Sequence, residues 1–336
     1  MLKKGRIMRS MVVWAVLAVT LGVMTGCGGE KNKEAEGKKV VNVGIIQLAE
    51  HSALDAANKG FVKGLEDNGY KENVNIKFDR QNAQGDHSNL QNIANRFVSN
   101  KVDLICAIST PAAQSVANAT KDIPIVGTAI TDYVTAKLII SNEEPKTNVT
   151  GTTNMNSIDK HIDLLLKIAP QTKQIGVIYN TSDVNSQVQV RILKELSAAK
   201  GLSVKEATVT SVNEIQQAAQ SLIAANVDAF YVPTDNVVAS GMPVLAGIAN
   251  EAKVPIICGE AAMVKNGALA TIGIDYYKLG MQTGAMAARI LDGKGNPAQM
   301  PIESQKELRT TVNEDTAAKI GVTIPMEILQ GAEIVK

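Results

Sequence analysis

The chain has 336 residues, of which 45% are hydrophobic, 20% charged and 3% aromatic, and its formal net charge is +1. This apolar content and near-balanced charge exclude a disordered polymer, and the length is sufficient for two ordinary domains. Three cysteines in this length exclude a disulfide-built miniprotein. The balanced charge gives no sign of a nucleic-acid partner, and one long apolar run excludes a protein with many membrane spans.

The first 26 residues have the pattern of a secretory signal. Residues 1–9 carry four basic and no acidic side chains, and an uncharged, mostly apolar run follows as far as Met24. Small residues then precede Cys27, which matches the bacterial lipobox, where cleavage before the cysteine leaves it acylated. We predict a lipoprotein signal peptide over 1–26 and lipidation at Cys27. An ordinary cleaved signal and an uncleaved membrane anchor are the alternatives.

The segment that follows has no apolar face. Residues 28–39 are charged and contain glycine, so 27–39 is predicted to be a lipidated cysteine with a flexible tether. This places the rest of the chain outside the cytoplasm, held at a membrane surface by its lipid. The two remaining cysteines, Cys106 and Cys258, lie in apolar runs and are predicted to be buried thiols rather than a disulfide.

The folded part repeats one order of elements. Short β-branched runs with a central glycine occur at 41–47 and 173–179, and each precedes a helical stretch that ends at Gly69 or Gly201. The predicted helices and strands that correspond are 54–68 and 185–200, 74–79 and 203–208, 88–99 and 212–225, 102–108 and 227–232, and 124–127 and 255–259. The order is therefore βαβαβαβ, twice.

Strands that alternate with helices predict parallel sheets with right-handed crossovers, and near-continuous apolar strands fit sheets covered on both faces. We predict an α/β chain with two similar Rossmann-like lobes. A helix over 277–291 and a strand and helix over 308–320 complete the lobes by crossing back between them. The first lobe is assigned to 40–145 plus about 273–306, and the second to 146–272 plus about 307–336.

Candidate ligand-binding residues lie where the strands end, because ligands of open α/β sheets bind at the carboxyl ends of the strands. In the first lobe they are Gln47, His51, Ser109, Thr110, Thr128, Asp132 and Tyr133. In the second lobe they are Tyr179, Asn180, Asn185, Thr234, Asp235, Asn236 and Glu260.

Ser109 and Thr110, followed by a proline, are typical of a helix start. The free N–H groups of such a start would suit a carboxylate or a phosphate, although simple helix capping explains the same residues. Among the acids, Asp132 and Asp235 would either bind an ammonium group or cap the next turn. A carboxylate at Glu260, after a buried strand, is unusual unless it is paired.

The sequence gives little support to an enzyme. It has no G-x-S-x-G elbow, no G-x-x-x-x-G-K-[ST] loop, and no G-x-G-x-x-G after either first strand. Three isolated histidines without ligand spacing predict no metal site, and no cofactor is expected. A tethered protein with a two-lobed cleft favours capture and release of a ligand over chemistry.

Several motifs, in order, carry a family resemblance. They are Gly44-Ile45-Ile46-Gln47, His51-Ser52-Ala53-Leu54-Asp55, Ser109-Thr110-Pro111-Ala112-Ala113-Gln114, Ile130-Thr131-Asp132, Pro233-Thr234-Asp235-Asn236 and Gly273-Ile274-Asp275-Tyr276. Over about residues 40–324 the chain resembles the ABC-transporter substrate-binding lipoproteins grouped with tryptophan- and tyrosine-binding proteins. The resemblance implies a type I periplasmic-binding-protein fold, whose two lobes are joined by three crossovers and close on a ligand.

The resemblance also implies a monomer that works with an ABC permease and ATPase, and an aromatic amino acid as ligand. Hinges are expected at 141–150, 271–275 and 307–311, and Asp275, which belongs to the last of the quoted motifs, is also a candidate ligand-binding residue. For a zwitterionic ligand, Ser109 and Thr110 would hold the carboxylate, and Asp132 or Asp235 with Glu260 would hold the ammonium.

Tyr179 or Tyr133 would then stack on the ligand side chain. The family commonly has Asp-Pro where this chain has Asp132-Tyr133, a departure that would place a ring near the cleft. On this hypothesis Asp235→Ala weakens binding at least about tenfold in a folded protein. A sugar or nucleoside receptor, and a surface lipoprotein with an adhesin or sensing role, are the alternatives.

Overall fold

The computed structural model describes residues 40–336. The predicted signal peptide, the lipidation site Cys27 and the tether lie outside these residues. Within 40–336, no helix is both long enough and apolar enough to cross a membrane.

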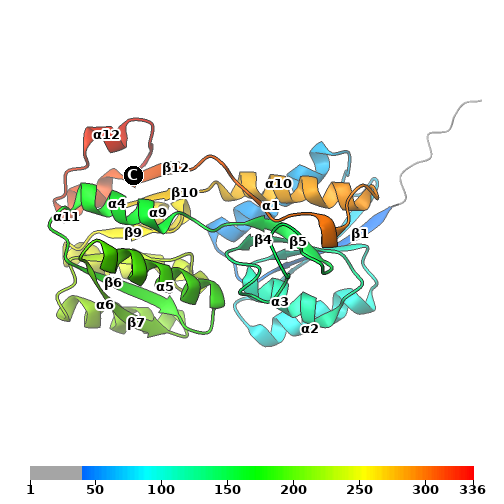
Figure 1. Cartoon of the computed structure of the whole chain (residues 1–336), viewed down its shortest axis with the longest axis horizontal. Helices are drawn as coiled ribbons and strands as arrows, with labels where there is room; N and C mark the ends of the chain where they lie inside the picture. Colours follow the sequence, from blue (N-terminus) through cyan, green and yellow to red (C-terminus); the bar gives the residue numbers. More distant parts are fainter. Residues whose placement is uncertain (1–39) are drawn as a thin grey trace, which may run out of the picture. The chain divides into compact units, whose positions relative to one another are not determined.

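The first lobe is a six-stranded sheet in the order β11-β5-β4-β3-β1-β2, and its strand pairs are all parallel. Its strands are β1 (Val41–Gln47), β2 (Ile76–Asn82), β3 (Leu104–Ile108), β4 (Ile125–Ile130), β5 (Val149–Thr153) and β11 (Glu303–Ser304). Its helices are α1 (Ser52–Asp67), α2 (His87–Ser99), α3 (Thr110–Ala119) and α10 (Tyr276–Leu291), with a 3₁₀ turn at Pro297–Gln299. Helices α1 and α10 cover one face of the sheet, and α2 and α3 cover the other (Figure 1).

The second lobe is a seven-stranded sheet in the order β13-β12-β10-β9-β8-β6-β7. Its strands are β6 (Gln174–Asn180), β7 (Ser203–Val209), β8 (Ala229–Val232), β9 (Ile256–Cys258), β10 (Ala270–Gly273), β12 (Arg309–Asn313) and β13 (Glu333–Val335). Its helices are α4 (Ile158–Ile168), α5 (Val184–Ala199), α6 (Ile215–Ala224), α7 (Asn236–Ser240), α8 (Met242–Glu251), α9 (Ala261–Lys265), α11 (Glu314–Ile320) and α12 (Met326–Leu329), with a 3₁₀ turn at Val212–Glu214. The pair β10–β12 is antiparallel and the others are parallel.

Apolar strands covered on both faces by helices hold each lobe together. All five residues of β3 are buried, and one continuous apolar cluster fills the first lobe. In the second lobe, Val177 and Ile178 of β6 belong to two different clusters, because neighbouring residues of a strand point to opposite faces. The predicted repeat is confirmed, and Cys106 and Cys258 are buried free thiols, as expected.

Three short segments connect the lobes: residues 154–157 after β5, 274–275 before α10, and 305–308 between β11 and β12. The predicted lobe boundary at 145/146 and the predicted hinge at 141–150 are wrong, because β5 pairs with β4 in the first sheet. The sequence of β5, with three threonines and a glycine, lacks the apolar run that marked the other strands.

Candidate ligand-binding site

The two lobes contact each other at the carboxyl ends of their strands through His51, which stands just before α1. Its Nε2 lies 3.2 Å from the side-chain Oδ1 of Asn236 at the start of α7. An amide oxygen only accepts hydrogen bonds, so Nε2 carries the proton and donates. The other ring nitrogen, Nδ1, is buried and has no partner among the described residues.

Glu260 is the buried acid of this region. It follows β9, and its side chain is 3% exposed. The hydroxyl of Tyr276, the first residue of α10, bonds to its carboxylate and also accepts a hydrogen bond of 2.8 Å from Nδ2 of Asn154. Burial raises the pKa of Glu260, while the nearby His51 and the Tyr276 hydroxyl lower it in part. Its Oε1 has no partner in the described part of the chain.

Two asparagine side chains bond to backbone carbonyls at the ends of β9 and β8. The side-chain amide of Asn156 donates to the carbonyl of Gly259, and that of Asn185 donates to the carbonyl of Thr234 at 3.0 Å. A carbonyl accepts only, so each amide nitrogen faces its carbonyl and each Oδ1 faces elsewhere. Both Oδ1 atoms are buried without a partner in residues 40–336.

These residues form what we call the interlobe cluster: His51, Asn154, Asn156, Asn185, Glu260 and Tyr276. Seven buried side-chain polar atoms in the described chain lack a partner, and four of them belong to this cluster. An unpaired buried polar atom costs about 1–3 kcal/mol, so such a concentration is typical of a site that a polar ligand completes. Three of the four are oxygen acceptors, which fit a ligand rich in N–H or O–H donors.

In the first lobe, Ser109 precedes α3 with a φ of 103°, in the region that disfavours residues other than glycine. Its Oγ accepts from the backbone N–H of Ala112 at 3.4 Å, and Thr110 beside it is buried. Backbone strain of this kind persists where the surrounding fold enforces it, often at binding sites. The N-terminus of α3 thus lies at the same sheet edge as the loop that carries His51.

Several predicted site residues satisfy their polar groups inside one lobe. Asp235 accepts from the backbone N–H groups of Asn180, Val237 and Val238 and from the hydroxyl of Ser186, at 2.6–3.0 Å. Asp132 caps its own turn through Val134 and Thr135. The others engaged in this way are Gln47, Thr128, Asn180, Thr234 and Asp275.

The structure places Tyr133 and Tyr179, predicted to offer a ring to the ligand, with their hydroxyls bonded inside single lobes. Tyr133 is 1% exposed, and its hydroxyl donates to the carbonyl of Thr152 inside the first lobe. Tyr179 packs in the core of the second lobe, and its hydroxyl donates to Glu206 of the edge strand β7 at 2.8 Å. Their places at strand ends did not show to which side of the sheet the rings point.

Sequence reasoning missed four residues of the region: Asn154, Asn156, Tyr276 and Asp183. Asn154 and Asn156 lie in the first connection between the lobes, which was predicted at 141–150 and is observed at 154–157. Tyr276 begins a helix that was expected to begin one residue later. Asp183 is bonded to Asn236, and its burial and the nearby Asp235 raise its pKa to about 7. Two asparagines close together in a connection between strand and helix, at 154 and 156, are the sequence signal that could have indicated these site residues.

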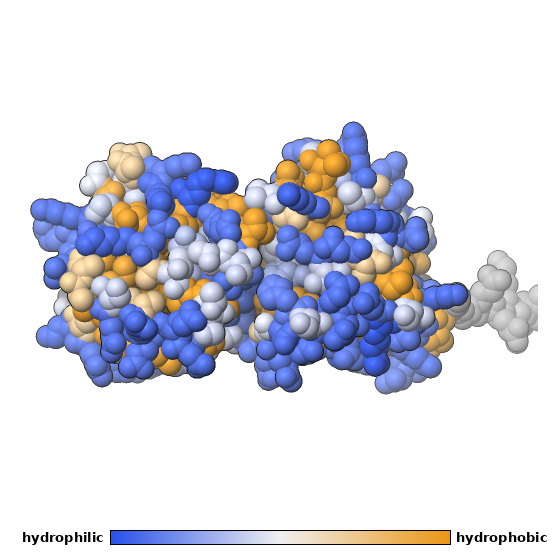
Figure 2. Space-filling view, turned by 90° about the horizontal axis from the view of Figure 1, so that it is seen from below, coloured by the Kyte–Doolittle hydropathy of each residue, from blue (hydrophilic) through white to orange (hydrophobic). Residues whose placement is uncertain are grey.

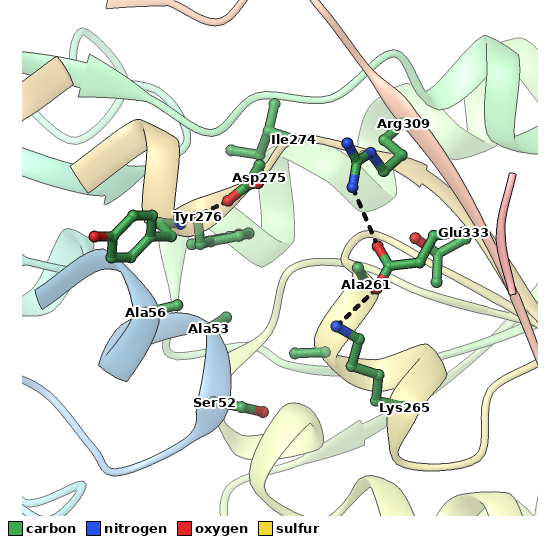
Figure 3. A pocket seen from close by; sticks show the side chains of 14 residues that line it. Ser52, Ala53, Ala56, Ala261, Lys265, Ile274, Asp275, Tyr276, Arg309 and Glu333 are labelled. Atoms are coloured by element: carbon green, nitrogen blue, oxygen red, sulfur yellow. Dashed lines mark hydrogen bonds and ion pairs between the residues drawn. The ribbon is translucent and has the colours of Figure 1, made fainter. Parts of the chain in front are cut away.

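A pocket of about 180 Å³ adjoins the interlobe cluster at Tyr276, between the first turns of α1 and α10 and helix α9 (Figure 3). Alanines of α1 and α9 line it, and on one side Glu333 pairs with Lys265 at 3.0 Å and with Arg309 at 3.7 Å. Glu333 thus lies between the two cations, and its single negative charge offsets one of their two positive charges. Where the lobes meet, Figure 2 shows weakly polar residues rather than a broad apolar surface.

The chain has two α/β lobes joined by three short connections, and unpaired polar groups lie where the strands of the two lobes end. This arrangement is typical of a two-lobed solute-binding protein. Within residues 40–336, no group of three or more His, Cys, Asp or Glu side chains could hold a metal ion. The fold is that of the type I periplasmic binding proteins.

Comparison with known proteins agrees with this class. The family of ABC transporter substrate binding proteins matches residues 42–336. The chain is 47% identical to a tyrosine-binding protein of Clostridioides difficile, over 94% of this chain and 92% of that protein. The chain therefore belongs to the ABC transporter substrate-binding protein family. It is a non-enzymatic solute receptor that acts outside the cytoplasm.

Two solved structures show how closely the fold is shared. The Streptococcus pneumoniae ABC domain in complex with L-Trp is 36% identical, with a TM-score of 0.85, and covers 88% of this chain and 100% of its own. The ligand-free, open structure of a Clostridium difficile substrate binding protein with adhesive properties is 49% identical, with a TM-score of 0.70, and covers 88% of this chain and 99% of its own.

Proposed function

We propose that this protein is the receptor of an ABC importer for an aromatic amino acid such as tyrosine or tryptophan. The observation that carries the proposal is the unpartnered Oε1 of Glu260, buried where the lobes meet. A buried carboxylate is costly without an opposite charge, and the α-ammonium group of an amino acid supplies both charge and donors. Asn156, whose amide is fixed on Gly259 next to Glu260, offers a second acceptor for that group.

The aromatic class is supported by two relatives: one is named a tyrosine-binding protein and the other was solved with L-Trp. Tyr276 is the aromatic residue that the described chain brings to the cluster, in place of Tyr133 and Tyr179. The ligand carboxylate is assigned to the N-terminus of α3 at Ser109 and Thr110, where free N–H groups and the helix dipole favour an anion.

Transport follows from the division of these groups between the lobes. A ligand that contacts α3 in the first lobe and Glu260 in the second has a higher affinity for the closed arrangement and so shifts the population toward it. An ABC permease, driven by its ATPase, then recognises the closed form and accepts the ligand. Lipidation at Cys27 would hold the receptor at the membrane surface near that permease.

Titration calorimetry with the purified chain tests the proposal, using the twenty amino acids, common sugars and nucleosides. We expect an aromatic amino acid to bind, and Glu260→Gln to weaken that binding at least about tenfold, because the neutral amide loses the charge-assisted bonds. Glu206→Gln is the matched control, since Glu206 lies on β7 and bonds to Tyr179 and Lys194. Binding of a sugar or nucleoside alone, unaffected by Glu260→Gln, would contradict the proposal.

A second role has one specific observation in its favour. The 49% identical Clostridium difficile protein is described as a substrate binding protein with adhesive properties. Adhesion by this chain would use its outer surface and would not need the interlobe cluster. Binding of the chain to host-cell surfaces, unchanged by Glu260→Gln, would support it, and no binding would contradict it.

A further inference from the structure

A chain of hydrogen bonds runs from the first lobe to Glu260 through the connections between the lobes. Thr131 follows β4, and its hydroxyl donates to Oδ1 of Asn154 at 3.1 Å. Asn154 begins the connection after β5, and its Nδ2 donates to the hydroxyl of Tyr276 at 2.8 Å. Tyr276 follows the second connection, at the start of α10, and its hydroxyl bonds to the carboxylate of Glu260 in the second lobe.

The donors of this chain all point toward Glu260. An amide oxygen only accepts and an amide nitrogen only donates, so the Tyr276 oxygen accepts from Asn154 and its one proton is left for Glu260. The hydroxyl of Thr131 is buried, and Asn154 is the acceptor that the described chain gives it. If the amide turned over, Tyr276 would donate to Asn154 instead. The carboxylate of Glu260 would then lose its donor, and the Thr131 proton would lose its acceptor.

The bond from Tyr276 favours the ionised form of Glu260. Burial raises the pKa of Glu260, and the nearby His51 and the Tyr276 hydroxyl lower it in part. Burial also raises the pKa of Tyr276 well above its ordinary value, so its hydroxyl keeps the proton that it donates. Cys258 is a further titratable group beside Glu260: its thiol donates to the backbone carbonyl of Glu260 at 3.4 Å, and burial raises its pKa, so it stays neutral.

We propose that Thr131 and Asn154 are positioning residues of the receptor, which act through the hydroxyl of Tyr276. They direct this hydroxyl to donate to Glu260, so that the buried side chain stays a carboxylate and binds an ammonium group. This inference rests on the proposed function and adds the means by which the charge of its central acid is maintained. A protonated Glu260 would have no charge to offer the ligand.

Tyr276→Phe tests the last step of the chain, because it removes the donor and keeps the ring. The affinity for L-tyrosine and L-tryptophan is measured by titration calorimetry over about pH 4 to 9, the range that buried glutamates cover. Affinity should be full above the pKa of Glu260 and fall as the pH falls through it. In Tyr276→Phe this pKa is higher, so we expect the midpoint of the fall to move up by about one pH unit.

Two features of this comparison isolate Glu260. Histidine side chains also titrate in this range, but His51 is present in every protein compared, so its contribution cancels in the difference. Tyr277→Phe is the matched control, since Tyr277 is the next residue of α10 and is 39% exposed. Its midpoint should equal that of the unmodified chain.

Thr131 tests the positioning role, because it stands two hydrogen bonds before the one to Glu260. Thr131→Val removes the proton that favours the observed orientation of the Asn154 amide, and we expect an upward shift of the midpoint, smaller than that of Tyr276→Phe. Thr131→Ser keeps the hydroxyl and should restore the original midpoint. A merely structural role of Thr131 would instead weaken binding equally at every pH and leave the midpoint unchanged.

The outcomes separate this inference from the proposed function. Binding of an aromatic amino acid with the same midpoint in Tyr276→Phe as in the unmodified chain would overturn the inference and leave the proposed function standing. A shifted midpoint in Tyr276→Phe with none in Thr131→Val would overturn the positioning role of Thr131. No binding of any aromatic amino acid at any pH would overturn the proposed function, and this inference with it.

Discussion

At the scale of single residues, Asp235 shows how a plausible ligand contact turns out to be a structural one. Both of its oxygens are engaged, by three backbone N–H groups and the Ser186 hydroxyl, and the side chain is 1% exposed. It caps α7 and ties that helix to the end of β6 through Asn180. Its carboxylate has no oxygen left to offer an ammonium group, which revises the expectation drawn from the sequence.

We therefore expect Asp235→Ala to lower the free energy of unfolding by about 2–4 kcal/mol, because the substitution removes a helix cap and leaves buried donors unpaired. Urea denaturation followed by circular dichroism measures this change. Asp132→Ala is the control, since Asp132 caps a turn whose donors lie at the surface, and should cost only about 1 kcal/mol. A normally stable Asp235→Ala that binds ligand tenfold more weakly would return Asp235 to the site.

The candidate site could be predicted in part, because position at a strand end is visible in the sequence while side-chain direction is not. His51, Asn185 and Glu260 were expected at the cleft from the order of strands and loops, and the structure brings them to the interlobe cluster. Tyr133 was expected there on the same grounds, yet its ring packs inside the first lobe and its hydroxyl donates to the carbonyl of Thr152. Only packing decides between these outcomes, and packing depends on residues far away in the chain.

At the scale of elements, α1 and α10 lie on the same face of the first sheet (Figure 1), and their backbones approach closely at glycines of both helices. A Cβ added at Gly60 would collide with the carbonyl oxygen of Tyr277, and one added at Gly280 would collide with that of Ala57. The four glycines at this contact are Gly60, Gly64, Gly280 and Gly284. Since α10 enters the lobe directly after the crossover and begins with Tyr276, this contact also positions the Tyr276 hydroxyl against Glu260.

We expect Gly280→Ala to destabilise the protein by roughly 1–3 kcal/mol, because the added methyl group forces two helices apart against backbone atoms that cannot move alone. Gly247→Ala on α8 is the matched control: a Cβ there meets nothing within 4 Å. The control should stabilise the protein by about 0.5–1 kcal/mol, the difference in helix propensity. Denaturant unfolding measures both, and a neutral Gly280→Ala would show that the helices can separate without cost.

The fold could be predicted where apolar runs and helix-ending glycines mark the elements. The prediction failed where these signals are absent. The helix ending at Gly201 was expected over 185–200 and is observed at Val184–Ala199, because the stop signal at that glycine is strong. Strand β5 is rich in threonine and was read as a connection, which moved the first crossover. Its register on β4 is a tertiary feature that local patterns do not carry.

At the scale of the whole binding unit, the pocket beside Tyr276 shows that the lobes also meet through the first turns of α1 and α9, which begin directly after His51 and Glu260. Ser52, Ala53 and Ala56 of α1 line one side of it, and Ala261 and Ala262 of α9 line the other (Figure 3). These small side chains allow the two helices to approach when the lobes come together. The pocket adjoins the crossover at 274–275, so its size changes with the angle between the lobes.

Ala262→Trp should therefore oppose any closer approach of the lobes, since an indole ring takes up most of the free space of about 180 Å³ between α1 and α9. We expect the affinity for the amino acid ligand to fall at least about tenfold, because part of the binding free energy is then spent on relieving the clash. Small-angle scattering should show less compaction on addition of ligand than the unmodified chain shows. Ala224→Trp, at the exposed end of α6, controls for the bulk and hydrophobicity of tryptophan. Unchanged affinity and compaction in Ala262→Trp would mean that the lobes close without bringing α1 and α9 together, and closure would then depend on the interlobe cluster alone.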